Sequence, residues 1–320
     1  MVKVALIGFG MINKAVKAKI DQMSGWVVET VIRKSSLGEQ HSFHMSDIAF
    51  LAIPTENGGD TARQYIAQSL AMGIPIVTCE KGALSHHFDK FLRNFDKLGY
   101  SATVGGGTRL LPSLRERLNG RKDVIVHGVV NGTLNFIFSA MDNDSDSLGA
   151  AVKKAMKLGY AEPGAESALD VLNGEMMDTV MKTAIIYNTC MRLGKSMNAG
   201  DVKIVALDSK NLARLVREVS VRRYVVSFLP QSKDGEEDSA DIIGGFSYSI
   251  DGWKIRAGFV RTDSDPLFRS RLPAGANNCI ITCEGVGGED GIYVLANGPG
   301  AGPEPTASSM MSDARKLLRL

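Results

Sequence analysis

The stretch LIGFGMINKA, residues 6–15, decides the fold of the first part of the chain. It follows an apolar, strand-like run and opens a helix-like segment at 12–23. Gly8 and Gly10 match the first two glycines of the dinucleotide-binding pattern G-x-G-x-x-G, which allow a tight turn and a close approach of the backbone to a pyrophosphate. Asn13 replaces the third glycine, which normally allows close packing of the helix on the strand. We therefore expect a phosphate site with the helix slightly further from the sheet; a plain structural turn is the alternative.

Apolar runs alternate with helix-like segments through residue 118. The expected strands are 2–8, 27–33, 47–54, 75–79 and 101–106, and the expected helices are 12–23, 56–73 and 86–98. Fully apolar strands separated by helices indicate a parallel sheet covered on both faces. The first part is therefore predicted to be an α/β domain of the Rossmann type.

The pattern changes after Leu118. A strand is expected at 124–130, helices from 135 and at 147–158 and 174–194, strands at 221–229, 242–250, 277–285 and 290–298, and a last helix after Pro305 with Thr306 as its cap. This order predicts an α+β second domain with a mainly antiparallel sheet.

Composition limits the class of protein. The chain has 320 residues, 44% of them hydrophobic and 22% charged, with a formal net charge of +2. That is enough for two domains. The positive residues are scattered, which argues against a nucleic-acid partner, and no apolar stretch reaches the roughly 20 residues that span a bilayer, so no membrane role is expected. Because cysteines are few and no secretory leader precedes the first strand, we expect a cytoplasmic protein.

The closest cysteine pair is Cys279 and Cys283. Four residues apart in a strand-like run, they lie on one face, so a zinc pair is one interpretation if histidines join them. Two small buried hydrophobes are the favoured alternative.

The end of the second expected strand bears on the choice of cofactor. An Asp or Glu there would bind the ribose 2′-hydroxyl of NAD, but the strand runs into Arg33, Lys34 and Ser35. Cations and hydroxyls suit a 2′-phosphate, which favours NADP; a solvated basic loop is the alternative. Glu29 lies inside the strand, too early to bind the ribose.

Spacing alone does not indicate a functional role for four charged residues, Asp178, Lys182, Glu162 and Lys81. Asp178 and Lys182 stand four apart on an apolar helix and so share one face, as an exposed salt bridge would. Glu162 and Lys81 would be assigned to solvent by the same reasoning.

Six segments together resemble the ordered signature of homoserine dehydrogenases. They are VTCEKGAL (77–84), VGGGTRLLP (104–112), HGVVNGTLNFI (127–137), KLGYAEP (157–163), DVLNGEMMDTVMK (170–182) and GPGAGPEPTASSMMSD (298–313). The resemblance implies an NAD(P)-dependent oxidoreductase acting on a CH–OH group. Its reaction interconverts L-homoserine and L-aspartate 4-semialdehyde in the biosynthesis of threonine, methionine and isoleucine.

The resemblance also implies the site residues. Lys182 and Lys81 match the two lysines beside the reacting oxygen, and Glu162 and Asp178 match the carboxylates that hold the substrate. The remaining substrate-binding candidates are Gly159, Tyr160 and Thr133. We expect Lys182 to be the acid/base, with its pKa lowered by desolvation and a second cation, and Lys81 to polarise the same oxygen, although the two roles could be exchanged.

The cofactor residues are implied in the same way. The pyrophosphate is expected at Gly8, Gly10, Met11 and Ile12, the 2′-phosphate at Arg33 and Lys34, the nicotinamide at Thr55 and Lys81, and the cover over the cofactor at Gly298, Gly300 and Gly302. The last placement implies that the terminal helix returns to the first domain. We therefore expect residues 1–118 plus 303–320 to bind the dinucleotide and 119–302 to bind substrate, catalyse and dimerise.

The chain departs from the family pattern at several positions. Glu80 replaces the usual asparagine and could pair with Lys81 and raise its pKa. Arg109 is expected either to neutralise a substrate carboxylate or to point to solvent. The spacing from Glu162 to Asp178 is longer than usual, so Glu175 is the alternative carboxylate.

The family often holds a monovalent cation. Here the carbonyls of Val104, Gly106 and Thr108 would hold it, with Ser101 in place of the usual glutamate, so sodium is allowed but not expected. A homodimer is expected, because antiparallel sheets expose edges and faces that relatives bury. Two other functions stay open: another NAD(P) dehydrogenase acting on an amino acid or aldehyde, and a catalytically silent dinucleotide-binding sensor.

Overall fold

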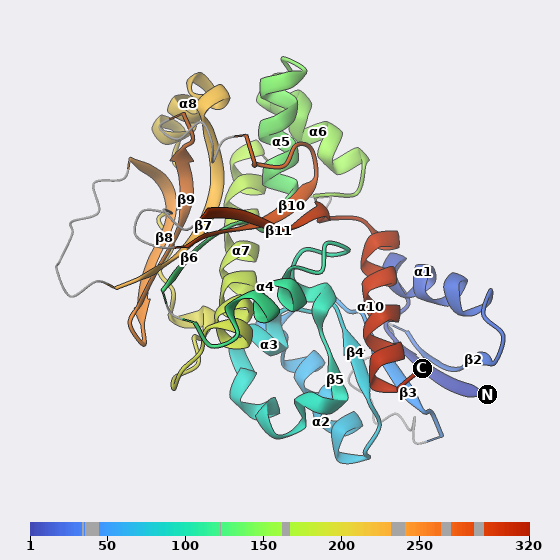
Figure 1. The fold of residues 1–320 in the computed structure, drawn as a ribbon. Coiled ribbons are helices and arrows are strands. Elements are labelled where there is room, and N and C mark those ends of the chain that lie inside the picture. Colours follow the sequence, from blue (N-terminus) through green and yellow to red (C-terminus); the bar gives the residue numbers. More distant parts are fainter. Residues whose placement is uncertain are drawn as a thin grey trace.

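The chain forms two β-sheets, each with its own helices (Figure 1). This computed structural model describes residues 1–33, 35, 45–121, 123–161, 167–231, 241–263, 270–284 and 291–320. Lys34 and Glu162 lie outside the described residues.

The first sheet is parallel and has five strands. Their order is β2 (Trp26–Ile32), β1 (Val2–Ile7), β3 (Ile48–Leu51), β4 (Ile76–Thr78) and β5 (Leu98–Gly99). The strand β3 is buried along its whole length, as expected for a strand covered on both faces. The predicted Rossmann-type sheet is confirmed.

Helices α1 (Met11–Ile20), α2 (Asp60–Ala71), α3 (Gly82–His87) and α10 (Pro303–Leu317) pack around this sheet. The terminal helix α10 runs beside α1 (Figure 1). Its Ala307 and Met310 share a buried cluster with Val4 of β1, and Glu304 forms an ion pair with Lys19 of α1 at 2.9 Å. The predicted return of the last helix to the first sheet is confirmed.

Asn13 anchors α1 to the sheet. It is fully buried, and its side-chain amide donates to the carbonyl oxygens of Ile7, Gly8 and Phe50 at 3.0, 2.8 and 3.3 Å. Asn13 thus replaces the missing glycine with hydrogen bonds to the ends of β1 and β3. Gly8 is required for a different reason, because its φ is +80° and a Cβ there would lie 2.2 Å from the Ala52 oxygen.

The second sheet is antiparallel and has six strands. Their order is β11 (Gly291–Pro299), β10 (Asn277–Glu284), β6 (Val124–Val129), β7 (Arg222–Pro230), β9 (Trp253–Arg261) and β8 (Ile242–Ile250). Its accompanying helices are α4 (Leu110–Leu118), α5 (Gly132–Asn143), α6 (Leu148–Lys157), α7 (Ala168–Cys190) and α8 (Ser209–Arg217). The predicted α+β second unit is confirmed.

Helix α7 connects the two halves of the molecule. Its 23 residues contact α5 and α6 on the side of the second sheet and α3 on the side of the first. Side chains on α7 can therefore meet the loop that follows β4.

Several expected elements were wrong or missed. Residues 101–106 do not form a strand: Ser101–Thr103 is a 3-10 turn, and Gly105 and Gly106 have φ of +78° and +51°, which no strand contains. The helix expected at 86–98 is α3 followed by a 3-10 stretch, Phe88–Lys97. The helices and strands that the sequence did not reveal include α4, α8, β5 and β9.

The cap expected for the last helix was also wrong. Helix α10 begins at Pro303, with Gly302 before it, and the Thr306 hydroxyl donates to the Gly302 oxygen at 2.8 Å within the first turn.

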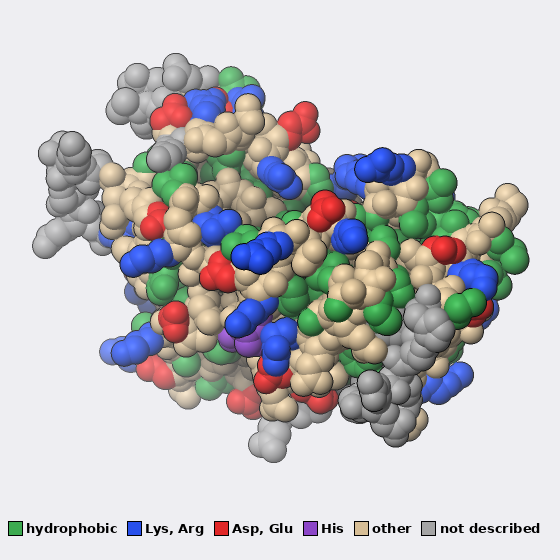
Figure 2. Space-filling model, turned by 90° about the horizontal axis from the view of Figure 1, so that it is seen from below, with side chains coloured by type: hydrophobic (Ala, Val, Ile, Leu, Met, Phe, Trp, Pro, Cys, Tyr) green, Lys and Arg blue, Asp and Glu red, His purple; other side chains and the backbone are tan. Residues whose placement is uncertain are grey.

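No helix in the described ranges is both long enough and apolar enough to cross a bilayer. On the face shown in Figure 2, Lys and Arg side chains are interspersed with Asp and Glu.

Candidate active site

Two lysines from opposite halves of the molecule meet at one aspartate. Lys81 follows β4 at the start of α3, and Lys182 lies on α7, one turn after Asp178. The Lys81 Nζ lies 3.2 Å from Asp178 Oδ1, and the Lys182 Nζ lies 2.7 Å from Asp178 Oδ2. Their side chains are between 12% and 26% exposed, so this is not the exposed helix-surface pair that spacing alone suggested.

The charges of this cluster reinforce one another. Burial alone would raise the pKa of Asp178, but the ammonium groups of Lys182 and Lys81 outweigh it and hold that pKa well below its usual range. The Asp178 carboxylate in turn raises the pKa of Lys81, more than burial lowers it. A raised pKa was expected for Lys81, but its main cause is Asp178 rather than Glu80, and Lys81 stays an ammonium donor.

Glu175 lies one turn before Asp178 and extends the cluster. Burial, and then the charge of Asp178, raise the pKa of Glu175 to about 7. The Asn131 amide donates to Glu175 Oε2 at 2.7 Å and to Asp178 Oδ2 at 3.2 Å. Glu175, considered only as an alternative carboxylate, is thus part of the same cluster as Asp178.

Asn131 was missed as a site residue. It caps α5, because its Oδ1 accepts from the Leu134 N–H at 2.8 Å, and this leaves its amide free to face the two carboxylates. The available signal was an asparagine between an apolar strand and a helix, but asparagine is also a common N-cap residue at helices that bind nothing.

Glu80 does not pair with Lys81 as expected. Its carboxylate accepts hydrogen bonds from the N–H groups of Gly82 and Ala83, at 2.6 and 2.9 Å, and from the Thr55 hydroxyl at 2.5 Å. Asp178 is the largest influence on the pKa of Lys81, and Glu80 the smallest. Glu80 therefore caps α3 and fixes the backbone at Lys81.

The substrate-binding candidates near α6 lie together. Gly159 ends α6 with φ of +72°, and the Thr133 hydroxyl donates to the Tyr160 carbonyl at 2.7 Å. The Tyr160 ring packs edge-on against Phe136. Thr133 lies two residues after Asn131, so this segment lies next to the start of α5, while the expected partner Glu162 lies outside the described residues.

A cleft of about 440 Å³ opens at the carboxyl end of β1. Gly8, Phe9, Gly10, Arg33, Ser35 and the segment 52–54 line it. A Cβ on Gly10 would meet nothing within 4 Å, and the Arg33 guanidinium lies 5.0 Å from the centre of the Phe9 ring. The cleft thus combines the first two pattern glycines with the arginine expected at the 2′-phosphate.

The other cofactor candidates do not line this cleft. Met11 is exposed, Ile12 packs against a core cluster, and Thr55 is bound to Glu80. Gly298 lies in β11 and Gly302 directly precedes α10. Gly298 and Gly300 lie by the glycine turn of residues 105–108, where the Gly107 N–H donates to the Pro299 carbonyl at 3.1 Å. A contact of these residues with cofactor stays a prediction.

The cation site also stays a prediction. Val104, Gly106 and Thr108 lie on the glycine turn, and the Thr108 hydroxyl donates to the Gly105 carbonyl. Ser101 donates through its N–H and hydroxyl to Asp313 of α10, at 2.7 and 2.8 Å. A carboxylate of the last helix is therefore bound by Ser101, the residue that stands in place of the family's glutamate.

Two alternatives lose support. Among the described residues, no group of three or more His, Cys, Asp or Glu side chains is placed to hold a metal, so the zinc interpretation of Cys279 and Cys283 has no ligand set. Arg109 is exposed, with φ of +56°, at the start of α4, in agreement with the solvent-facing alternative.

Known proteins resemble this chain in sequence and fold. A family model described as homoserine dehydrogenase matches residues 110–314. A homoserine dehydrogenase of Methanocaldococcus jannaschii is 27% identical over 263 residues, which cover 80% of this chain and 67% of the relative. An NAD(+)-dependent homoserine dehydrogenase of Pseudomonas canavaninivorans is 25% identical over 360 residues, covering 97% and 94%. The chain spans between 55% and 67% of the length of the first curated relatives.

Solved structures share the two-sheet fold. The homoserine dehydrogenase of Thermoplasma acidophilum superposes with a TM-score of 0.70 at 19% identity, covering 100% of this chain and 99% of the other. A hyperthermophilic archaeal homoserine dehydrogenase in complex with NADPH gives 0.62 at 17% identity, covering 100% and 98%. These likenesses show the fold, while the family model extends over more than half of the sequence, including α5, α7 and the glycine-rich end. The chain belongs to the homoserine dehydrogenase family.

Proposed function

We propose that the chain interconverts L-homoserine and L-aspartate 4-semialdehyde with NAD(P), as part of threonine, methionine and isoleucine biosynthesis. The observation that carries this proposal is the meeting of Lys81 and Lys182 at Asp178. Lys81 follows a strand of the same parallel sheet as Gly8, and the carboxyl ends of parallel strands lie on one edge of a sheet, where α/β proteins bind ligands.

The residues divide the chemistry of alcohol oxidation between them. A bound nicotinamide supplies the hydride acceptor. Lys81, held as an ammonium by Asp178, donates to the substrate oxygen and stabilises negative charge that develops there. Lys182 in its neutral form takes the hydroxyl proton as the alcohol becomes the aldehyde, and returns it in the reverse direction.

The carboxylates recognise the other end of the substrate. Homoserine carries an ammonium group, and a carboxylate is the side chain that binds it by a charge-assisted hydrogen bond. Asp178 stays ionised, and Glu175 lies one turn away with Asn131 between them. We assign the ammonium to this side of the site, together with Glu162.

Removal of the Lys182 amine tests the assignment. Initial rates with homoserine and NADP should fall at least about a hundredfold in Lys182→Ala, the usual effect of removing an acid/base, while the variant still binds NADPH. Lys153→Ala, at an exposed position of α6, is the control and should keep normal rates. Near-normal turnover in Lys182→Ala would end the acid/base assignment, and no turnover of homoserine by the wild type would end the proposed function.

We propose that NADP is preferred over NAD, because Arg33 and Ser35 line the cleft at Gly8. A charge-assisted bond to a phosphate contributes about 1.5–3 kcal/mol. Arg33→Ala should therefore raise KM for NADP at least about tenfold and leave KM for NAD within about twofold. Equal effects on both cofactors would remove the 2′-phosphate argument.

We also infer that the working protein is a homodimer, in the cytoplasm. One face of the second sheet carries a small apolar cluster, Val129, Val225, Cys279 and Ile281, separate from the main core. On the outer strand of that sheet, β11, Tyr293 and Val294 are both 42% exposed. Analytical ultracentrifugation should give twice the chain mass of 34.4 kDa; a monomer at micromolar concentration would contradict the inference.

A further inference from the structure

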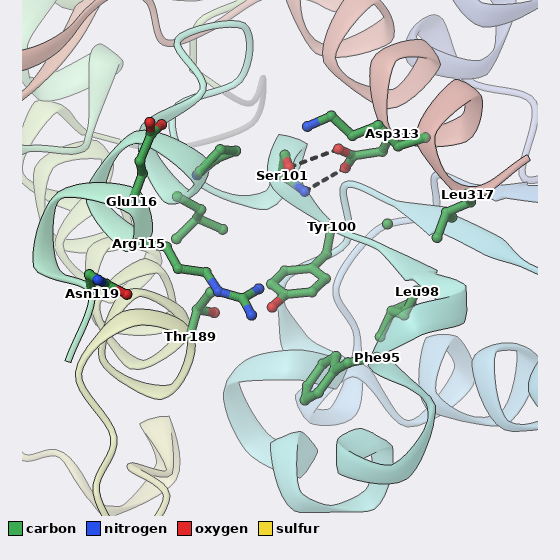
Figure 3. Close-up of a pocket in the computed structure, with 14 residues that line it drawn as sticks. Phe95, Leu98, Tyr100, Ser101, Arg115, Glu116, Asn119, Thr189, Asp313 and Leu317 are labelled. Atoms are coloured by element: carbon green, nitrogen blue, oxygen red, sulfur yellow. Dashed lines mark hydrogen bonds between the residues drawn. The ribbon is translucent and has the colours of Figure 1, made fainter. Parts of the chain in front are cut away.

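A second cavity lies apart from the catalytic cluster and the cofactor cleft. It has a volume of about 530 Å³, within the range of small-molecule sites. The residues that line it come from both halves of the molecule (Figure 3). Phe95, Leu98 and Tyr100 lie in or next to the last strand of the parallel sheet, β5. Leu111 and Arg115 lie on α4, and Thr189 lies on α7. It shares no lining residue with the cleft at Gly8.

One corner of this cavity gathers hydrogen-bond donors. In Figure 3 the Arg115 guanidinium lies close to the Tyr100 hydroxyl and to Thr189. Arg115 forms no ion pair with any described residue, and Glu116 points away from it (Figure 3). The Thr189 Oγ1 is buried without a hydrogen-bond partner of good geometry in the described structure. An unpaired guanidinium beside two hydroxyl donors is a site for an anion.

The rest of the cavity limits which anion fits. Phe95, Leu98, Leu111 and Leu317 provide an apolar wall. On the far side of the cavity, Asp313 accepts two hydrogen bonds from Ser101 and does not pair with Arg115 (Figure 3). The negative charge of the Asp313 carboxylate would repel a doubly charged anion. The second lining cation, Lys316, acts on the charge of Asp313, which leaves Arg115 as the cation of the hydroxyl-lined corner. One cation in that corner beside an apolar wall suits one carboxylate on an apolar body better than it suits a phosphate.

We propose that this cavity binds a small carboxylate whose other end is apolar, with the carboxylate at Arg115, Tyr100 and Thr189. Such a ligand would contact the segment around β5, in the first half of the molecule, and the helices α4 and α7, in the second half. It would also contact α7 seven residues after Lys182, about two helical turns away. The site is independent of the proposed oxidoreductase activity.

Binding can be measured directly with 4-methylpentanoate as the probe. Methyl NMR should show shifts at Leu98, Leu111 and Leu317 with a Kd of about 1 mM or tighter. Arg115→Gln should weaken binding at least about tenfold, and Thr189→Val, which keeps the shape and removes the hydroxyl, about threefold or more. The exposed arginine in Arg93→Gln is the matched control and should leave the Kd unchanged.

Further probes separate this site from weaker explanations. The neutral 4-methylpentan-1-ol should bind at least about tenfold more weakly, inorganic phosphate should not displace the probe, and saturating NADPH should leave its Kd unchanged. Displacement by NADPH or by phosphate, equal binding of the alcohol, or an unchanged Kd in Arg115→Gln would each overturn the proposal.

Discussion

A single carboxylate, Asp178, organises the candidate site, because each of its oxygens holds a different lysine. Asp178 and Lys182 were predictable as neighbours, since a separation of four puts two helical residues on one face. That Lys81, almost 100 residues earlier, joins them followed only from the family resemblance. Asn131 was missed, and Glu175 was considered only as an alternative carboxylate, because their contact depends on burial and on a hydrogen bond between two helices, which spacing does not encode.

Glu175 should make stability depend on pH. Its pKa is raised from an ordinary 4.5 to about 7, so the folded protein keeps a proton that the unfolded chain has already released in that interval. The unfolding free energy is therefore highest, as far as Glu175 is concerned, below pH 4.5, and it falls as the pH rises from 4.5 to about 7. Glu175→Gln, which cannot ionise, should gain about 1–3 kcal/mol of unfolding free energy relative to wild type between pH 5 and pH 8.

Urea unfolding at the two pH values measures this change. The exposed carboxylate in Glu116→Gln is the control and should show no such gain. If the difference in unfolding free energy between the wild type and Glu175→Gln stayed constant from pH 5 to pH 8, this would contradict the raised pKa.

At the scale of elements, α3 shows how a short helix positions a side chain that we propose to be catalytic, Lys81. Glu80 binds the first N–H groups of α3 and the Thr55 hydroxyl, and Lys81 is the residue between that carboxylate and the helix. The sequence shows a glutamate beside a lysine and suggests a salt bridge. The structure differs because two backbone N–H groups and a hydroxyl satisfy the carboxylate, while Asp178 satisfies the lysine.

Loss of this cap should affect turnover more than cofactor binding. Glu80→Ala should lower the unfolding free energy by about 1–2 kcal/mol, as for other helix caps, and lower kcat about tenfold or more, with KM for NADP within about twofold. Glu80→Gln keeps an acceptor for the backbone and should recover most of kcat. Wild-type kcat in Glu80→Ala would show that Lys81 does not depend on the cap.

Longer elements were predictable where their pattern was strong. The strands β1 to β4 and the helices α1, α2, α5, α6 and α10 lie where periodicity placed them, within a few residues, while α7 begins at Ala168 rather than at the expected residue 174. The strand β9 was missed because Lys254 and Arg256 interrupt its apolar residues. Residues 101–106 were expected to form a strand because they are small and apolar, but Gly105 and Gly106 adopt positive φ and make a turn.

At the scale of the whole molecule, the two lysines proposed for catalysis come from the two halves of the chain. Lys81 is fixed by the parallel sheet and Lys182 by α7, which packs against the helices of the antiparallel sheet and also reaches α3. The fold class followed from strand and helix order, but the relative placement of the two units did not. Asn13 illustrates the same limit, since its departure from the glycine pattern is compensated by carbonyls of two strands that only the assembled sheet brings together.

The central claim is that these two ammonium groups act together on one substrate oxygen. A double-mutant cycle in kcat/KM for homoserine, with Lys81→Met, Lys182→Met and the double variant, tests it most directly. Each single variant should lose at least about a hundredfold, and the double variant should lose little more than the worse single variant, because residues that act as a unit are not additive. Losses that multiply in the double variant, or a loss below about tenfold in either single variant, would contradict the account.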